Sequence, residues 1–265
     1  MGVTDRSIIW EDEPIEVNGI VLYPILMRNY QEWLVCKGAL TFRLSSLPAL
    51  YMAMPYLSAI YATDCEMGFQ TGLMSRIFKL LSLSTHMPET DFVPLVDKEN
   101  PQNLTAIFCK NPERMFRIEA WQFDAIRQAI LDLNGEELPD ESENIELVEA
   151  ERDIAEANAQ KLDYDVQTML ASVACAYRIR VKDMADWSVR EFDQARSAID
   201  RSRQHLLCAI SEVSEKTVTF KNGNPVPSWC FDRKKEGSTA LEPLSALAQR
   251  AGFSANSLQE TMPEP

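Results

Sequence analysis

The chain has 265 residues, 46% of them hydrophobic and 25% charged, so it is long enough to bury a core and has an ordinary globular composition. Its formal net charge is −14 and its pI is near 4.7. This balance argues against nucleic-acid binding, because contacts to phosphates need a basic surface. Residues 136–165 form an acidic belt with twelve acidic and two basic residues, which favours solubility and repels polyanions.

The sequence predicts a cytosolic protein with reduced thiols. Residues 1–14 are polar and acidic and lack the apolar core of a signal peptide. The longest apolar stretch, residues 47–62, contains two prolines and is too short to cross a bilayer. The six cysteines are widely spaced, with no Cys-x-x-Cys pair, so we expect no metal site; they are Cys36, Cys65, Cys109, Cys175, Cys208 and Cys230.

The first part of the chain predicts a hairpin followed by buried helices. Asn18-Gly19 lies between two apolar runs, and this pair is typical of a tight turn between strands because both residues tolerate positive φ. Residues 28–83 have helical spacing, with Ser45-Ser46 as a capping candidate and a kink or break expected at Pro55. The clearest helical stripe comprises Leu73, Ile77, Leu80 and Leu81.

Two short strands and a helix are predicted next. Residues 87–103 read as a polar connection, and residues 104–109 and 115–121 as paired strands around a turn at 110–113. A helix is predicted over residues 121–133, ending at Asn134-Gly135. Its buried face is expected to comprise Phe123, Ile126, Ile130 and Leu133.

The region after the acidic belt is again helical. One stripe is formed by Val166, Met169, Leu170, Val173 and Tyr177. A second helix is predicted to begin at a Ser188 cap, with Glu191 completing a capping box and Trp187 packing on Phe192 across the start. Its apolar face would comprise Phe192, Ile199, Leu206, Ile210 and Val213. We therefore expect aspartate at Phe192 or at Leu206 to unfold this region.

These elements predict a mainly α fold with small β-hairpins, an α+β class. The predicted division is an N-terminal α+β domain (1–135), an acidic helical connector (136–162), a helical C-terminal region (163–219) and an extended arm with a partly disordered tail (220–265).

No residue pattern predicts catalysis. The two histidines, His86 and His205, have no neighbouring residues that would complete a metal or acid–base set. The nine glycines form no phosphate-binding loop, and no Gly-x-Ser-x-Gly run is present. We therefore expect no enzymatic activity, no cofactor and no metal. A small enzyme with an unrecognised site is the remaining catalytic alternative.

Flexible and aromatic side chains are abundant around residues 51–74. Methionine-rich surfaces suit variable partners, although core filling explains the same residues equally well. The cluster comprises Tyr51, Met52, Met54, Tyr56, Tyr61, Met67 and Met74. As partner-binding candidates we single out Tyr51, Met54, Tyr56, Leu57, Trp187, Phe192 and Leu206.

Several runs of the sequence resemble one protein family. They are YPILMRNYQEWLVCKGALTFRLSSLPALYMAMPYLSAIYATD (23–64), FDAIRQAILDLNGEELPDE (123–141), VKDMADWSVREFDQA (181–195) and FKNGNPVPSWCFDR (220–233). In these runs the chain resembles the tail assembly chaperones of long-tailed phages and of prophages of Gram-positive bacteria. The C-terminal arm departs from the family, many of whose members are shorter, and the alternative that it indicates is a structural protein of the tail or baseplate.

The resemblance implies a non-enzymatic role in virion morphogenesis. It implies binding to the tape measure protein, a long apolar helical polymer, which is kept soluble in the host bacterial cytoplasm until tail tube protein polymerises around it. It further implies contact with the tail tube protein, self-association and no membrane or nucleic-acid partner. A partner with an apolar groove and an acidic exterior fits such a client.

Overall fold

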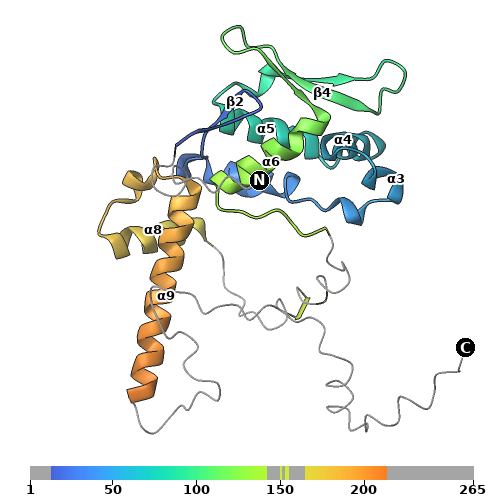
Figure 1. The fold of residues 1–265 in the computed structure, drawn as a ribbon. Coiled ribbons are helices and arrows are strands. Elements are labelled where there is room, and N and C mark those ends of the chain that lie inside the picture. The colour runs from blue at the N-terminus through green and yellow to red at the C-terminus, as the bar shows by residue number, and fades with distance from the viewer. Residues whose placement is uncertain (1–12, 142–149, 151–152, 155–164, 214–265) are drawn as a thin grey trace, which may run out of the picture. The chain divides into compact units, whose positions relative to one another are not determined.

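The computed structural model describes residues 13–141, 150, 153–154 and 165–213 (Figure 1). Most of the acidic belt, the predicted arm and Cys230 lie outside these residues. The α-helices are α2 (Tyr30–Cys36), α3 (Ala49–Met52), α4 (Tyr56–Glu66), α5 (Leu73–Thr85), α6 (Phe123–Leu133), α8 (Val166–Tyr177) and α9 (Val189–Val213). The strands are β1 (Ile15–Val17), β2 (Ile20–Leu22), β3 (Phe92–Val96), β4 (Leu104–Cys109) and β5 (Phe116–Glu119). Helices predominate and the strands form two small antiparallel sheets, which confirms the predicted α+β class.

Short 3-10 helices connect several of these elements; they are η1 (Met27–Asn29), η2 (Lys37–Ala39), η3 (Leu44–Ser46), η4 (Glu89–Asp91), η5 (Ala120–Gln122) and η6 (Val181–Met184).

The predicted N-terminal hairpin is present. β1 and β2 pair antiparallel, with Ile15 opposite Leu22. Asn18 and Gly19 adopt φ of 52° and 78°, the left-handed conformation that a two-residue turn of this kind requires. Ile15, Ile20 and Leu22 are buried, so the hairpin packs one face on the core.

Proline divides the next helical region as predicted. α3 ends before Pro55, and α4 begins directly after it. The four stripe residues of α5, which include Ile77 and Leu80, are all buried. The predicted cap at Ser45-Ser46 is wrong, because α3 begins after Pro48 without a side-chain cap. The Ser46 hydroxyl instead donates to the carbonyl of Arg43, at 2.6 Å.

The second sheet has three strands in the order β3-β4-β5. β4 and β5 are the predicted pair, with Ile107 opposite Ile118. β3 was missed, because residues 87–103 read as a polar connection. Its sequence hides the strand: Pro94 interrupts it, the register shifts after Leu95, and its burial does not alternate.

Helix α6 buries the predicted face and ends at the predicted residues. Asn134 is buried, and its Oδ1 accepts the Ile25 amide at 2.9 Å while its Nδ2 donates to the Ile130 carbonyl at 2.7 Å. Gly135 follows with φ of 75°, the left-handed residue expected after a helix. Asn134 therefore closes α6 and also fixes the chain that follows β2.

The C-terminal helices share the core of the N-terminal region. Val173 of α8 and Phe192 of α9 are buried in the same cluster as Trp33 and Phe123. A backbone connection reinforces this packing: Val189 N–H donates to Ile25 O at 2.8 Å, and Met27 N–H to Trp187 O at 2.8 Å. The core thus continues past the boundary predicted at residue 135.

The Ser188 cap predicted at the start of α9 is present. The Glu191 amide donates to Ser188 Oγ at 3.0 Å, and Ser188 is buried. Trp187, half-buried, packs against the core and meets the Tyr177 ring edge-on at 5.7 Å. Phe192 lies in the core, with its ring 5.9 Å from that of Tyr30.

The chain forms two compact units, Met1–Ile199 and Asp200–Pro265. The described part of the second unit is the distal half of α9. There Leu206 and Ile210 are 59% and 58% exposed, so burial of the predicted apolar face does not extend to these two residues. The spacing of apolar residues predicts the apolar face of a helix, but it does not show how far along the helix the rest of the protein covers that face.

Within the described residues, none of the helices combines the length and the apolar character that crossing a bilayer requires. The five cysteines in this part of the chain are free thiols, buried at Cys36 and Cys109, half-buried at Cys65 and Cys208, and exposed at Cys175.

Candidate partner-binding surface

Exposed apolar side chains lie on α3 and in the turn that follows α4. Tyr51 of α3 is buried against Ala59 and Ala62, which lie one turn apart on α4. Its hydroxyl donates to the carboxylate of Glu66 at the end of α4. The Tyr51 side chain therefore packs on α4 and reaches its last residue.

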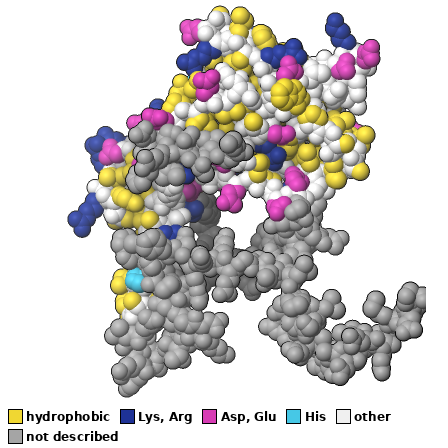
Figure 2. Space-filling model, in the orientation of Figure 1, with side chains coloured by type: hydrophobic (Ala, Val, Ile, Leu, Met, Phe, Trp, Pro, Cys, Tyr) yellow, Lys and Arg dark blue, Asp and Glu magenta, His cyan; other side chains and the backbone are white. Residues whose placement is uncertain are grey.

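Four large apolar side chains are exposed on these elements. Leu50 and Met52 extend from α3 and are 69% and 47% exposed, because only Tyr51 of this short helix faces α4. Met67 and Phe69 follow the end of α4 and are 53% and 57% exposed. We call these four residues the α3–α4 apolar surface. Figure 2 shows hydrophobic side chains gathered over this part of the first unit.

Phe69 has an unusual backbone. It follows Gly68, and both adopt φ of 60°, in the left-handed region that bulky residues rarely occupy. Such a conformation costs on the order of 1–3 kcal/mol and persists only where the surroundings enforce it. Here the Phe69 amide donates to the Asp64 carbonyl at 2.6 Å, and its ring meets that of Tyr61 edge-on at 6.2 Å. The chain thus holds an exposed aromatic ring in a strained position.

The buried carboxylate of Asp64 fixes the turn between α4 and α5. Asp64 is fully buried, accepts the Met74 amide at 2.7 Å through Oδ2, and accepts the Thr71 hydroxyl through Oδ1. It satisfies an amide of the first turn of α5, whose own N-cap residue, Gly72, has no side chain to do so. The α4–α5 turn that carries Met67 and Phe69 is therefore fixed at both ends.

The predicted partner-binding residues occupy different environments. Tyr56, Leu57 and Phe192 are buried in the main core, so their side chains have no surface to offer a partner in this conformation. These three residues fill the core, which is the alternative to partner binding that the sequence left open for the residues around 51–74. The remaining four are Tyr51, buried against α4, Met54 and Trp187, both half-buried, and Leu206, which is exposed.

Sequence reasoning missed Leu50 and Phe69 as surface residues. Leu50 lies in an apolar run that reads as buried on every side, and only the docking of Tyr51 turns it outward. Gly68 before Phe69 was the available signal, since a glycine after a helix marks a left-handed turn. Trp121 is another exposed aromatic residue, at 68%. It belongs to η5, which is distant in sequence from α3 and α4.

The second unit carries an apolar surface of its own. Leu206, Leu207 and Ile210 are each more than half exposed on the distal half of α9. Spacings of four and three residues place Leu206 and Leu207 on the same side of the helix as Ile210. A single amphipathic helix with such a face is suited to pairing with another helix.

The described part of the chain offers no group of three or more His, Cys, Asp or Glu side chains placed to hold a metal ion. Among the charged side chains of the described residues, the buried ones are Asp64 and Arg127, and both have structural roles: Asp64 fixes a turn, and Arg127 bonds to the backbone carbonyls of Leu40 and Phe42. Comparisons with known protein families, with curated proteins and with solved structures found no match to this chain.

Proposed function

We propose that the protein is a non-enzymatic tail assembly chaperone of a long-tailed phage or prophage. In this role it binds the tape measure protein in the bacterial cytoplasm and keeps it soluble until tail tube protein polymerises around it. The support from the sequence is the family resemblance of residues 23–64, 123–141 and 181–195. The support from the structure is an exposed apolar surface on a protein of net charge −14.

The single observation that carries the proposal is the exposure of four large apolar side chains on α3 and in the turn after α4, which are Leu50, Met52, Met67 and Phe69. Monomeric proteins rarely expose several large apolar side chains together unless another molecule covers them. Two methionines among the four suit a client whose sequence varies along its length, because the unbranched thioether side chain adapts to different shapes.

The charge of the protein complements this surface. An amphipathic client helix would lay its apolar face on the α3–α4 apolar surface, while the acidic residues elsewhere stay in water. Coated clients would then repel one another and stay dispersed. A surface of only four large side chains gives modest affinity for each copy, and many copies along one client raise the total.

The test is co-expression with the tape measure protein of the phage or prophage that encodes the chain. We expect the wild-type chain to keep that protein in the soluble fraction and to co-purify with it. The double variant Leu50→Asp, Met52→Asp is expected to lose this effect. Val35→Asp is the matched control, because Val35 is a 64% exposed apolar residue of α2 outside the surface.

Finished particles separate the chaperone from its main alternative, a structural protein of the tail or baseplate. A chaperone is displaced during assembly, so mass spectrometry of purified particles should not detect it, although the infected-cell lysate contains it. Detection at a fixed copy number in particles would assign the chain to the virion instead. Failure of the wild-type chain to bind the tape measure protein would also reject the proposal.

A further inference from the structure

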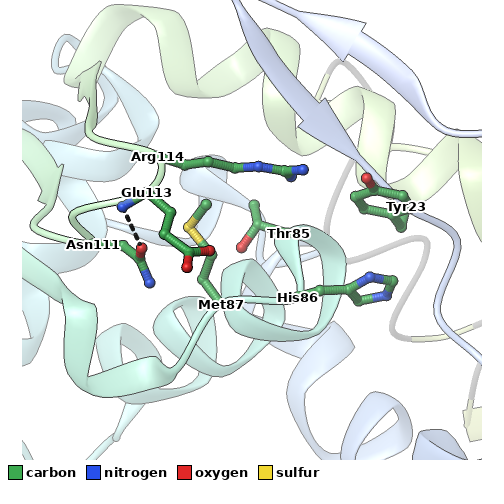
Figure 3. Close-up of a pocket in the computed structure, with 7 residues that line it drawn as sticks. All are labelled: Tyr23, Thr85, His86, Met87, Asn111, Glu113 and Arg114. Atoms are coloured by element: carbon green, nitrogen blue, oxygen red, sulfur yellow. Dashed lines mark hydrogen bonds between the residues drawn. The ribbon is translucent and has the colours of Figure 1, made fainter.

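A small cavity lies on the first unit. None of the residues that line it belongs to the α3–α4 apolar surface. The cavity has a volume of about 240 Å³ and opens between the C-terminal end of α5 and the turn that joins β4 to β5. Figure 3 shows its lining residues, which are Tyr23, Thr85, His86, Met87, Asn111, Glu113 and Arg114.

One wall is a fixed pair of aromatic rings. The Tyr23 and His86 rings stack with their centres 4.3 Å apart and their planes 19° from parallel. Both residues are held by the backbone: the Tyr23 amide donates to the Ser84 carbonyl at 2.7 Å, and His86 ends α5 in the left-handed conformation, with φ of 59°. This wall is therefore formed before any ligand arrives.

The opposite wall is a fixed turn. Asn111 Nδ2 donates to Asp91 Oδ2 at 2.8 Å, and Asn111 Oδ1 accepts the Glu113 amide at 3.0 Å. The Lys110 amide donates to the Asp91 carbonyl at 2.9 Å. These bonds hold the turn while leaving the side chains of Glu113 and Arg114 to line the cavity.

Glu113 and Arg114 line different sides of the cavity. In Figure 3 the Arg114 side chain extends across the cavity towards Tyr23, whereas the Glu113 carboxylate lies on the side of Met87. Both side chains are exposed, and neither has an ion-pair partner among the described residues. The cavity thus presents one cation and one anion that are not paired with each other.

The histidine contributes no further charge near neutral pH. Partial burial, and then the positive charges of Arg28 and Arg114, lower the pKa of His86 below its ordinary value. The imidazole is therefore neutral, and it offers a flat face and one N–H donor. Arg28 is itself paired with Asp186 at 3.0 Å, so Arg114 is the cation available to a ligand.

We propose that this cavity binds the C-terminal residue of a peptide. The terminal carboxylate would accept two parallel hydrogen bonds from the Arg114 guanidinium, the geometry that arginine offers to planar anions. The backbone N–H of the same residue would donate to the Glu113 carboxylate. Its side chain would lie on the Tyr23–His86 pair, which offers an apolar face.

Charge and size select this ligand over others. The carboxylate of Glu113 repels a dianion such as hydrogen phosphate more strongly than it repels a singly charged carboxylate, and it can accept the backbone N–H of a peptide. The volume is below the roughly 300–1,000 Å³ of sites for drug-sized molecules, so it suits a group of about one residue. Capture of a chain end through its carboxylate is an established mode of peptide recognition.

The test uses the full chain, isotopically labelled, titrated with N-acetyl-L-phenylalanine and followed by the NMR shifts of the amides of Thr85, His86 and Arg114. We expect saturable shifts with a Kd on the order of 1 mM for so small a ligand. N-acetyl-L-phenylalanine amide, which lacks the carboxylate, should bind at least about tenfold more weakly. Arg114→Gln should lose binding to the same degree, and Lys98→Gln, which replaces an exposed cation of the β3–β4 loop, should leave it unchanged.

Four results would overturn the assignment. Equal binding by the Arg114→Gln and Lys98→Gln variants, or no shift at these amides up to the solubility limit, would show that the cavity is no carboxylate site. Equal or tighter binding of inorganic phosphate would show that it is a general anion site. Tighter binding of free phenylalanine than of its N-acetyl form would assign it to amino acids and not to chain ends.

Discussion

The guanidinium carbon of Arg127 lies 3.6 Å from the centre of the Tyr56 ring, a cation–π contact between α6 and α4. The same guanidinium donates through Nε to the Leu40 carbonyl and through Nη2 to the Phe42 carbonyl, at 3.3 Å for the latter. The Tyr56 hydroxyl in turn donates to the Ala39 carbonyl at 2.7 Å. The two side chains therefore fix residues 39–42, the link between the N-terminal helices and the segment that leads to α3.

Arg127→Met is expected to lower the free energy of unfolding by about 2 kcal/mol. Methionine keeps much of the volume but leaves the Leu40 and Phe42 carbonyls without their donors and removes the cation–π contact. Urea denaturation followed by circular dichroism measures the change. Lys98→Met, at an exposed lysine, is the matched control and should leave the midpoint unchanged. A midpoint for Arg127→Met equal to that of the control would remove Arg127 from this role.

Alkaline pH should destabilise the protein through Tyr56. Burial raises the pKa of Tyr56 from about 10 to about 12, so the folded state holds this proton more tightly than the unfolded state does. Its contribution is fully present below pH 10 and is lost as pH rises from 10 through 12. Two pKa units correspond to roughly 2–3 kcal/mol at most.

Tyr56→Phe tests that effect, because phenylalanine cannot ionise. We expect the wild-type chain to lose more stability than Tyr56→Phe between pH 9 and pH 12 in urea titrations. The comparison cancels other groups that titrate in this range, including lysines and the thiols of Cys36 and Cys109, whose pKa values burial raises. Parallel pH dependence in the two proteins would show that Tyr56 ionises equally well in both states.

Asp64→Ala is expected to cost about 2–3 kcal/mol, since it leaves the Met74 amide and the Thr71 hydroxyl without their acceptor. Thr71→Val removes only one of these bonds and should cost less. In the double variant the two effects should not add, because both act on the same carboxylate. Thermal unfolding of the three variants gives the coupling, and full additivity would contradict the shared bond.

Aspartate at Phe192 and at Leu206 should have opposite outcomes. Phe192 is buried in the core of the first unit, so an unpaired carboxylate there should cost more than about 4 kcal/mol and unfold much of the chain. Leu206 is 59% exposed, and Leu206→Asp should stay within about 1 kcal/mol of the wild type. Unfolding by Leu206→Asp would show that this face of α9 is covered in solution.

The local elements follow from the sequence where a short-range rule governs them. Asn18-Gly19 predicts its hairpin because both residues accept positive φ, and Pro55 predicts the break between α3 and α4 because it lacks an amide donor. The buried stripe of α6 and the Ser188 cap follow from helical spacing and from the unsatisfied amides of a helix start. β3 could not be predicted in this way. Pro94 interrupts the strand and the register of β3 is irregular, so the sequence lacks the alternation of apolar and polar residues that indicates a strand.

The candidate surface was decided by tertiary packing. Tyr51, Leu50 and Met52 are alike in hydrophobicity and adjacent in sequence, so no local rule tells which of them faces α4. Burial is a property of the neighbouring surface, and that surface comes from residues distant in the chain. For the same reason Tyr56 and Phe192, predicted to meet a partner, lie in the core, whereas Phe69 is exposed. Sequence by itself determined where helices and turns begin and end; only the packed structure determined which apolar side chains remain for another molecule.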